Sequence, residues 1–101
     1  MNIQPLRHRR DAWAHLEDLY ILKFLAWGAT HRQIAATISQ ILQYRTAEAT
    51  RKRSHSLRQK YELNRTGGLL DVWKTWWTLS TLDFQNFNLT PDEENLLVSS
   101  H

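Results

Sequence analysis

The sequence predicts an all-α protein, in which a three-helix bundle is followed by a tryptophan-rich helical segment. Apolar residues recur three and four positions apart along most of the first 63 residues, which is the spacing of one helix face. Residues that commonly cap helices precede these stretches. The 101 residues also include only three glycines and two prolines, the residues that most often interrupt helices.

The first expected helix covers residues 13–27, where apolar side chains form a wide stripe at helical spacing. Glu17 and Asp18 lie in its first turn, where the positive end of the helix dipole favours anions. Gly28 is expected to end the helix, because glycine accepts the left-handed conformation that often follows a last helical turn.

Capping signals mark two further helices. Thr30 and Gln33 have the spacing of a capping box, in which each side chain bonds the backbone N–H of the other residue. Apolar residues then continue on one face through residues 34–42. Thr46 is the expected cap of the next helix, which runs over about residues 47–63.

The expected helix over residues 47–63 has two unlike sides. Small or apolar residues form one narrow strip, which comprises Ala47, Thr50, Ser54, Leu57 and Tyr61. The opposite strip is mainly polar and comprises Glu48, Ala49, Lys52, His55, Ser56 and Gln59. Further basic residues flank that polar strip: Arg51, Arg53, Arg58 and Lys60. A helix that served only to fill a core would rarely carry so broad a basic side.

Charge divides the chain into a basic and an acidic part. Residues 1–65 hold twelve Lys/Arg against five Asp/Glu, a net charge of +7, whereas residues 66–101 hold one base against five acids, a net charge of −4. The basic part favours a polyanionic partner, although solvated helix faces are also charged. With a Gly-Gly pair at the change of sign, the pattern predicts three segments: a basic arm over 1–11, a helical domain over 12–65 and an extension over 66–101.

The helical domain resembles a Myb/SANT-like helix-turn-helix domain. The residues that carry the resemblance are Trp13, Glu17-Asp18, Ile21, Leu25, Gly28, Thr30, Gln33-Ile34-Ala35, Arg45-Thr46, Arg51, Arg53 and Leu57. Over residues 12–61 this order is similar to short variants in which Gly-x-Thr-x-x-Gln-Ile-Ala opens the second helix and the middle tryptophan is missing. The sequence departs from the family at Ser54, where Myb repeats often have their last core tryptophan, and in a longer segment between Ala35 and Arg45.

The resemblance implies a tri-helical fold whose third helix binds the major groove of double-stranded DNA. It makes Trp13 the core aromatic residue of the first helix. Together with the basic helix side, it gives these candidate DNA-binding residues: Arg32, Arg45, Thr46, Glu48, Arg51, Lys52, Arg53, His55, Ser56, Arg58, Gln59 and Lys60. Lys52, His55 and Gln59 are candidates for contacts with bases, and the flanking arginines for contacts with phosphates. Arg7, Arg9 and Arg10 are candidates for a minor-groove arm.

The last 36 residues are rich in aromatic side chains. A short helix is expected over residues 68–80, and Thr90-Pro91 has the pattern of another helix start. Five large aromatic residues lie in this segment: Trp73, Trp76, Trp77, Phe84 and Phe87. We expect them either to pack on the three-helix core or to form a surface that binds a partner protein or a second copy. The alternative function is therefore a protein-interaction module.

Other classes of function find little support in the sequence. The absence of cysteine excludes thiolate metal sites and thiol catalysis. There is no glycine-rich phosphate loop and no pair of histidines four positions apart, and a helical chain of this size is expected to leave little room for a substrate pocket. We therefore expect no enzymatic activity, metal, cofactor or small-molecule substrate. The longest apolar run, residues 19–27, predicts no membrane span, and the expected compartment is the nucleus, or the cytoplasm of a bacterium.

Overall fold

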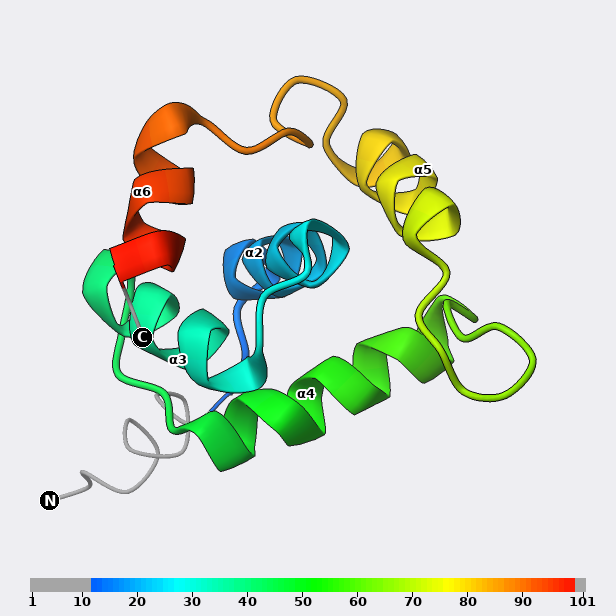
Figure 1. The fold of residues 1–101 in the computed structure, drawn as a ribbon, viewed down its shortest axis with the longest axis horizontal. Coiled ribbons are helices and arrows are strands. Elements are labelled where there is room, and N and C mark those ends of the chain that lie inside the picture. Colours follow the sequence, from blue (N-terminus) through cyan, green and yellow to red (C-terminus); the bar gives the residue numbers. More distant parts are fainter. Residues whose placement is uncertain (1–11, 100–101) are drawn as a thin grey trace, which may run out of the picture.

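A computed structural model describes residues 12–99, and every regular element within that range is an α-helix, which confirms the all-α prediction (Figure 1). The helices are α2 (His15–Trp27), α3 (His31–Ile41), α4 (Ala47–Lys60), α5 (Val72–Leu82) and α6 (Pro91–Ser99). Helix α2 lies in the middle and contacts α3, α4 and α5, while α3 also contacts α4 and α6.

The hydrophobic core forms around α2. Ile21, Leu22 and Phe24 of this helix have no exposed surface. The other helices add buried side chains to the same cluster: Ile34 and Ile38 from α3, Leu57 from α4, Leu79 from α5 and Leu97 from α6. Full burial of such a side chain contributes roughly 1.5–3 kcal/mol. Leu79 and Leu97 of the two C-terminal helices therefore stabilise the core that α2, α3 and α4 begin.

Most helix ends follow the signals in the sequence. Gly28 ends α2 with a φ of 100°. At the start of α3, the backbone N–H of Gln33 donates to the Thr30 hydroxyl over 3.1 Å, and the Thr30 N–H donates to the Gln33 side chain over 2.9 Å. Thr46 caps α4, and Thr90 caps α6 ahead of its first residue, Pro91. These predicted caps are confirmed.

Two predicted boundaries are wrong by several residues. The helix expected over 47–63 ends at Lys60. Glu62, two residues later, has a φ of 54° that no right-handed α-helix accommodates. The helix expected over 68–80 instead covers Val72–Leu82. The intervening chain turns through the Gly-Gly pair, whose φ angles are 95° and 86°, and Leu70 pairs with Asn64 in an isolated bridge.

A buried ion pair joins the start of α2 to the connection between α3 and α4. Arg45 donates from Nε to Glu17 Oε2 over 2.7 Å and from Nη2 to Glu17 Oε1 over 2.8 Å. The same Nη2 donates to the Ala12 carbonyl, and the side chain of Gln43 donates to Glu17 Oε1 over 3.2 Å. The guanidinium carbon lies 4.0 Å from the centre of the Trp13 ring. The connection between α3 and α4 is thereby held to the first turn of α2.

The carboxylate of Glu17 is stabilised in its charged form. Burial acts to raise its pKa, but the hydrogen bond from Arg45 and the one from the Ala14 backbone N–H outweigh burial and lower the pKa from 4.5. A carboxylate with a lowered pKa stabilises the fold above its unfolded-state pKa, and this contribution is lost as the pH falls through the folded-state pKa. The ion pair therefore makes the fold sensitive to acid.

Replacing Glu17 is expected to destabilise the fold strongly. Glu17→Gln leaves the Arg45 charge buried without a counterion, which costs about 3–5 kcal/mol. Urea unfolding at neutral pH measures this loss, and unfolding in acid is expected to show a smaller difference between the variant and the parent chain. Glu48→Gln, on the exposed side of α4, is the matched control. Equal free energies of unfolding for Glu17→Gln and the control would contradict this role of the ion pair.

Candidate nucleic-acid interface

One long side of α4 faces away from the rest of the protein. Figure 1 shows α4 along an edge of the molecule, with α2 and α3 on one side of it. Thr50, Ser54 and Leu57 are buried on that inner side. On the opposite side the exposed side chains are Glu48, Lys52, His55, Ser56 and Gln59, which we call the outer strip. The polar strip predicted from helical spacing is therefore exposed, apart from the half-buried Ala49.

A basic depression lies between α4 and the start of α3. It has a volume of about 210 Å³ and is lined by His31, Arg51, Ser54, His55 and Arg58, which we call the α3 notch. Arg51 and Arg58 are seven residues apart, so they lie on the same flank of the helix. His31 Nε2 is 3.3 Å from Ser54 Oγ, and this hydrogen bond links the two helices across the notch.

A second depression lies on the other flank of α4, toward α2. It has a volume of about 270 Å³ and is lined by Trp13, Ala49, Lys52, Arg53 and Ser56. Arg53 donates from Nε and Nη2 to the two carboxylate oxygens of Asp18, over 2.9 and 2.8 Å. This pair holds α4 against α2 and neutralises the charge of Arg53, so Lys52 is the more exposed of the two basic side chains on this flank.

The other two guanidinium groups of α4, those of Arg51 and Arg58, are held at the surface by nearby partners. Arg51 donates to Glu48 from Nε over 3.1 Å and from Nη2 over 2.7 Å, and Lys52 Nζ lies 3.9 Å from the same carboxylate. The bonds and charge of Arg51 lower the pKa of Glu48. Arg58 donates to the Asn64 side chain over 2.6 Å and to the Gly68 carbonyl over 2.9 Å. The two guanidinium groups are therefore oriented while still reachable from solvent.

The structure assigns different places to the other predicted DNA-binding residues. Arg45 is only 9% exposed and is held by Glu17, so its guanidinium is unable to reach a duplex and that part of the prediction is wrong. The Thr46 hydroxyl accepts from the Ala49 N–H and caps α4. Arg32 is exposed at the start of α3, and Lys60 Nζ lies over the Tyr61 ring. Arg7, Arg9 and Arg10 lie outside the described residues.

Sequence reasoning missed one member of this surface. His31 follows the Thr30 cap, and no motif connected it with α4. Its place in the α3 notch depends on how α3 packs across α4, which brings together residues 23 positions apart. The basic residues on the flank of α4 were the available signal for this side, but they did not identify the α3 residue opposite them.

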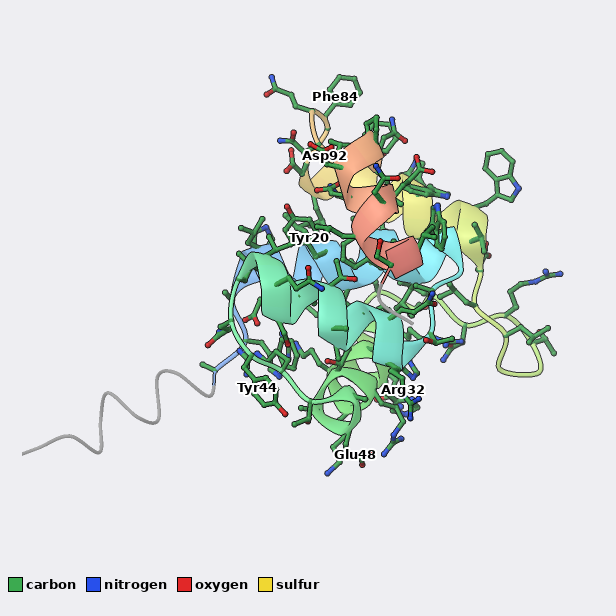
Figure 2. The ribbon with its side chains drawn as sticks, turned by 60° about the vertical axis from the view of Figure 1, so that its left-hand side comes forward. Tyr20, Arg32, Tyr44, Glu48, Phe84 and Asp92 are labelled. Carbon is green, nitrogen blue, oxygen red and sulfur yellow. The ribbon has the colours of Figure 1, made fainter. Side chains whose placement is uncertain are left out.

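The aromatic residues of the C-terminal extension divide into two groups. Trp76 and Phe87 are half-buried against the core, with ring centres 6.4 Å apart in an edge-to-face arrangement. Trp73, Trp77 and Phe84 are 86%, 67% and 77% exposed. Figure 2 shows Phe84 at the end of the molecule opposite Glu48 and Arg32. The predicted partner-binding set therefore includes two residues that belong to the core.

The expectation that the chain leaves little room for a pocket is wrong. A depression of about 440 Å³ lies between α2, the end of α5 and the start of α6, where Lys23 Nζ is 3.4 Å from Glu93 Oε1. Within residues 12–99, no group of three or more potential ligand side chains is arranged to hold a metal ion. No helix in the same range has both the length and the apolar character needed to cross a bilayer.

Comparison with protein families, curated proteins and solved structures finds no significant match for this chain. Its function is therefore argued from its own residues. Two exposed features carry that argument: the outer strip of α4 with its basic flanks, and the exposed aromatic group on and after α5.

The two groups of aromatic residues are expected to differ in their effect on stability. Trp76→Ala removes a half-buried indole from the core and is expected to lower the free energy of unfolding by about 1.5–3 kcal/mol. Trp73→Ala removes an indole that contacts mainly solvent, so its expected effect is below about 0.5 kcal/mol. Urea unfolding of both variants checks the prediction. An equal loss in the two would contradict the division.

Proposed function

We propose that α2, α3 and α4 form a Myb/SANT-like helix-turn-helix domain and that α4 binds in the major groove of double-stranded DNA. The observation that carries the proposal is the exposed outer strip of α4 with a basic depression on each flank. A DNA-binding role goes with location in a nucleus, or in the cytoplasm of a bacterium. No cofactor or small-molecule substrate enters this function.

The distribution of groups around α4 matches the surroundings of a helix in the major groove. That groove is about 12 Å wide and admits one α-helix, whose outer strip faces the base edges while its flanks face the two phosphate backbones. The outer strip of α4 offers the hydrogen-bonding side chains Lys52, His55 and Gln59. Guanidinium groups stand on the flank toward α3, and Lys52 borders the depression on the other flank.

Individual roles follow from side-chain chemistry. Gln59 is able to pair with adenine and Lys52 with guanine, because these side chains match the edges of those bases. Arg51 and Arg58 are placed for phosphates, which orient a protein on DNA without reading its sequence. Arg32, which is exposed at the start of α3, extends the basic surface on the same side of the molecule (Figure 2). Arg53 has a structural role through Asp18.

Removing basic side chains from α4 is expected to weaken DNA binding steeply. Fluorescence anisotropy with a labelled random-sequence duplex measures the affinity, and about four phosphate contacts predict a slope of log affinity against log salt near −4. The triple change Arg51→Ala, Lys52→Ala and Arg58→Ala is expected to abolish most binding, and the loss of the two phosphate contacts of Arg51 and Arg58 is expected to reduce that slope by about 2. Lys74→Ala, which removes one positive charge from α5, is the control for loss of charge away from α4. Unchanged binding by the triple variant would overturn the proposal.

Removing the acid on the outer strip is expected to strengthen binding. Glu48 repels phosphates and also occupies Arg51 and Lys52. Glu48→Gln releases both basic side chains from their ion pairs and is expected to raise the affinity for a random duplex by up to about fivefold at low salt. The same anisotropy titration measures this gain. Weaker binding by Glu48→Gln would show that the carboxylate itself contacts DNA bases, and the ion-pair explanation would then be wrong.

A second candidate function is binding of another protein through the exposed aromatic group. Trp73 and Trp77 lie one turn apart on α5 and share a face, and tryptophan is a frequent anchor at protein interfaces. This surface and α4 occupy separate parts of the molecule, so the candidates are compatible. Trp73→Ser with Trp77→Ser is expected to leave DNA binding unchanged, whereas a loss of DNA binding would place both functions on one surface.

A further inference from the structure

The α3 notch gathers hydrogen-bond donors without an acid among its lining residues. Arg51 and Arg58 enter it from α4, and His31 enters it from α3. Each guanidinium has more N–H donors than its present bonds to Glu48, or to Asn64 and Gly68, require. The notch therefore presents donors from two helices to an acceptor that approaches from solvent.

The electrostatic environment of His31 shows that positive charge accumulates in the notch. Burial is the largest cause that lowers the pKa of His31 from 6.5, and the charges of Arg51 and Arg58 lower it further. From α4, Ser54 and His55 also line the notch, and on α3 Arg32 follows His31 in the sequence. The nearest acid along α4, Glu48, is hydrogen-bonded to Arg51. An oxyanion in the notch would compensate this charge.

Protonation of His31 would add a donor at the same place. In the imidazolium form both ring nitrogens carry a proton. Nε2–H then donates to Ser54 Oγ, which lies 3.3 Å away, and Nδ1–H remains to donate to a bound anion. Ser54 thus orients the ring in either protonation state, and the charge of the imidazole becomes favourable once an anion is bound.

We propose that the α3 notch binds one phosphodiester group of the DNA backbone, through Arg51, Arg58 and protonated His31. This inference rests on the proposed function and names the site of one contact within it. The non-bridging oxygens of the phosphodiester accept hydrogen bonds from the guanidinium groups and from the imidazolium. Binding of the phosphate takes up a proton at His31, so the affinity for DNA rises as the pH falls, by at most about tenfold per pH unit.

The first experiment examines the notch without DNA. The Hε1 resonance of each histidine is followed by NMR during pH titrations in sodium sulfate and in sodium chloride of equal ionic strength. Sulfate keeps its charge over this range and is the probe for a tetrahedral oxyanion. A pKa of His31 that is higher in sulfate than in chloride, with His15 unchanged, supports the site. Equal His31 titrations in the two salts would overturn it.

The second experiment examines the same site with DNA. Anisotropy titrations with a random duplex compare the parent chain with His31→Gln at about pH 6 and about pH 8. Glutamine retains a donor for Ser54 but is unable to gain charge, so the variant is expected to lose the part of the pH dependence of binding that His31 contributes. His15→Gln, an exposed histidine at the start of α2, is the control and is expected to keep that dependence.

The two experiments separate failure of the notch from failure of the proposed function. DNA binding with no effect of sulfate on His31 and no effect of His31→Gln overturns the notch and leaves DNA binding by α4 in place. A sulfate effect on His31 without any duplex binding overturns the proposed function, and with it the assignment of the notch to DNA.

Discussion

The buried pair between Glu17 and Arg45 fixes the position of α4, on which the remaining features of the surface depend. Arg45 directly precedes the Thr46 cap of α4, so holding its guanidinium in the first turn of α2 also holds the start of α4. The backbone of Arg45 is bonded to the Ser39 hydroxyl of α3 as well. One carboxylate thus sets the relation between three helices. The pair of Arg53 with Asp18, farther along α4, fixes the direction in which the helix leaves that point.

With α4 held at both positions, small side chains are sufficient at two of the three buried positions on its inner side. Thr50 and Ser54 are fully buried where larger apolar residues would separate α4 from its neighbours. This close approach allows His31 of α3 to reach Ser54 and complete the α3 notch. The bulk of the core is supplied elsewhere, by α2 and by Leu79 and Leu97 of the C-terminal helices. The C-terminal extension therefore contributes stability to a domain whose proposed DNA-binding surface lies on α4.

Local structure was largely predictable from the sequence because its causes are local. The Thr30–Gln33 capping box and the turn at Gly28 are set by residues within four positions of each other, and the outer strip of α4 follows from helical periodicity. Long-range pairing was not predictable. Nothing near Arg45 indicates that its partner is Glu17, 28 residues earlier, so a basic residue beside the expected DNA-binding helix was interpreted as a DNA contact.

The same limit applies to the aromatic residues and to the pocket beside α2. Trp76 and Trp77 are adjacent in the sequence, and only the packing of α5 on α2 decides that the first is half-buried and the second exposed. Likewise, the depression that Lys23 and Glu93 line joins residues 70 positions apart. Tertiary packing alone creates it, and the composition that predicted little room for a pocket contains no information about that packing.

The central claim is that the outer strip and flanks of α4 contact DNA. The most direct test is a ¹⁵N NMR titration of the chain with a short duplex, in which backbone and tryptophan indole resonances are followed together. If α4 contacts DNA, the largest shifts occur along α4 and at the start of α3, while the indole resonances of Trp73 and Trp77 do not move. Shifts confined to those indoles and to α5, with α4 unchanged, would contradict it.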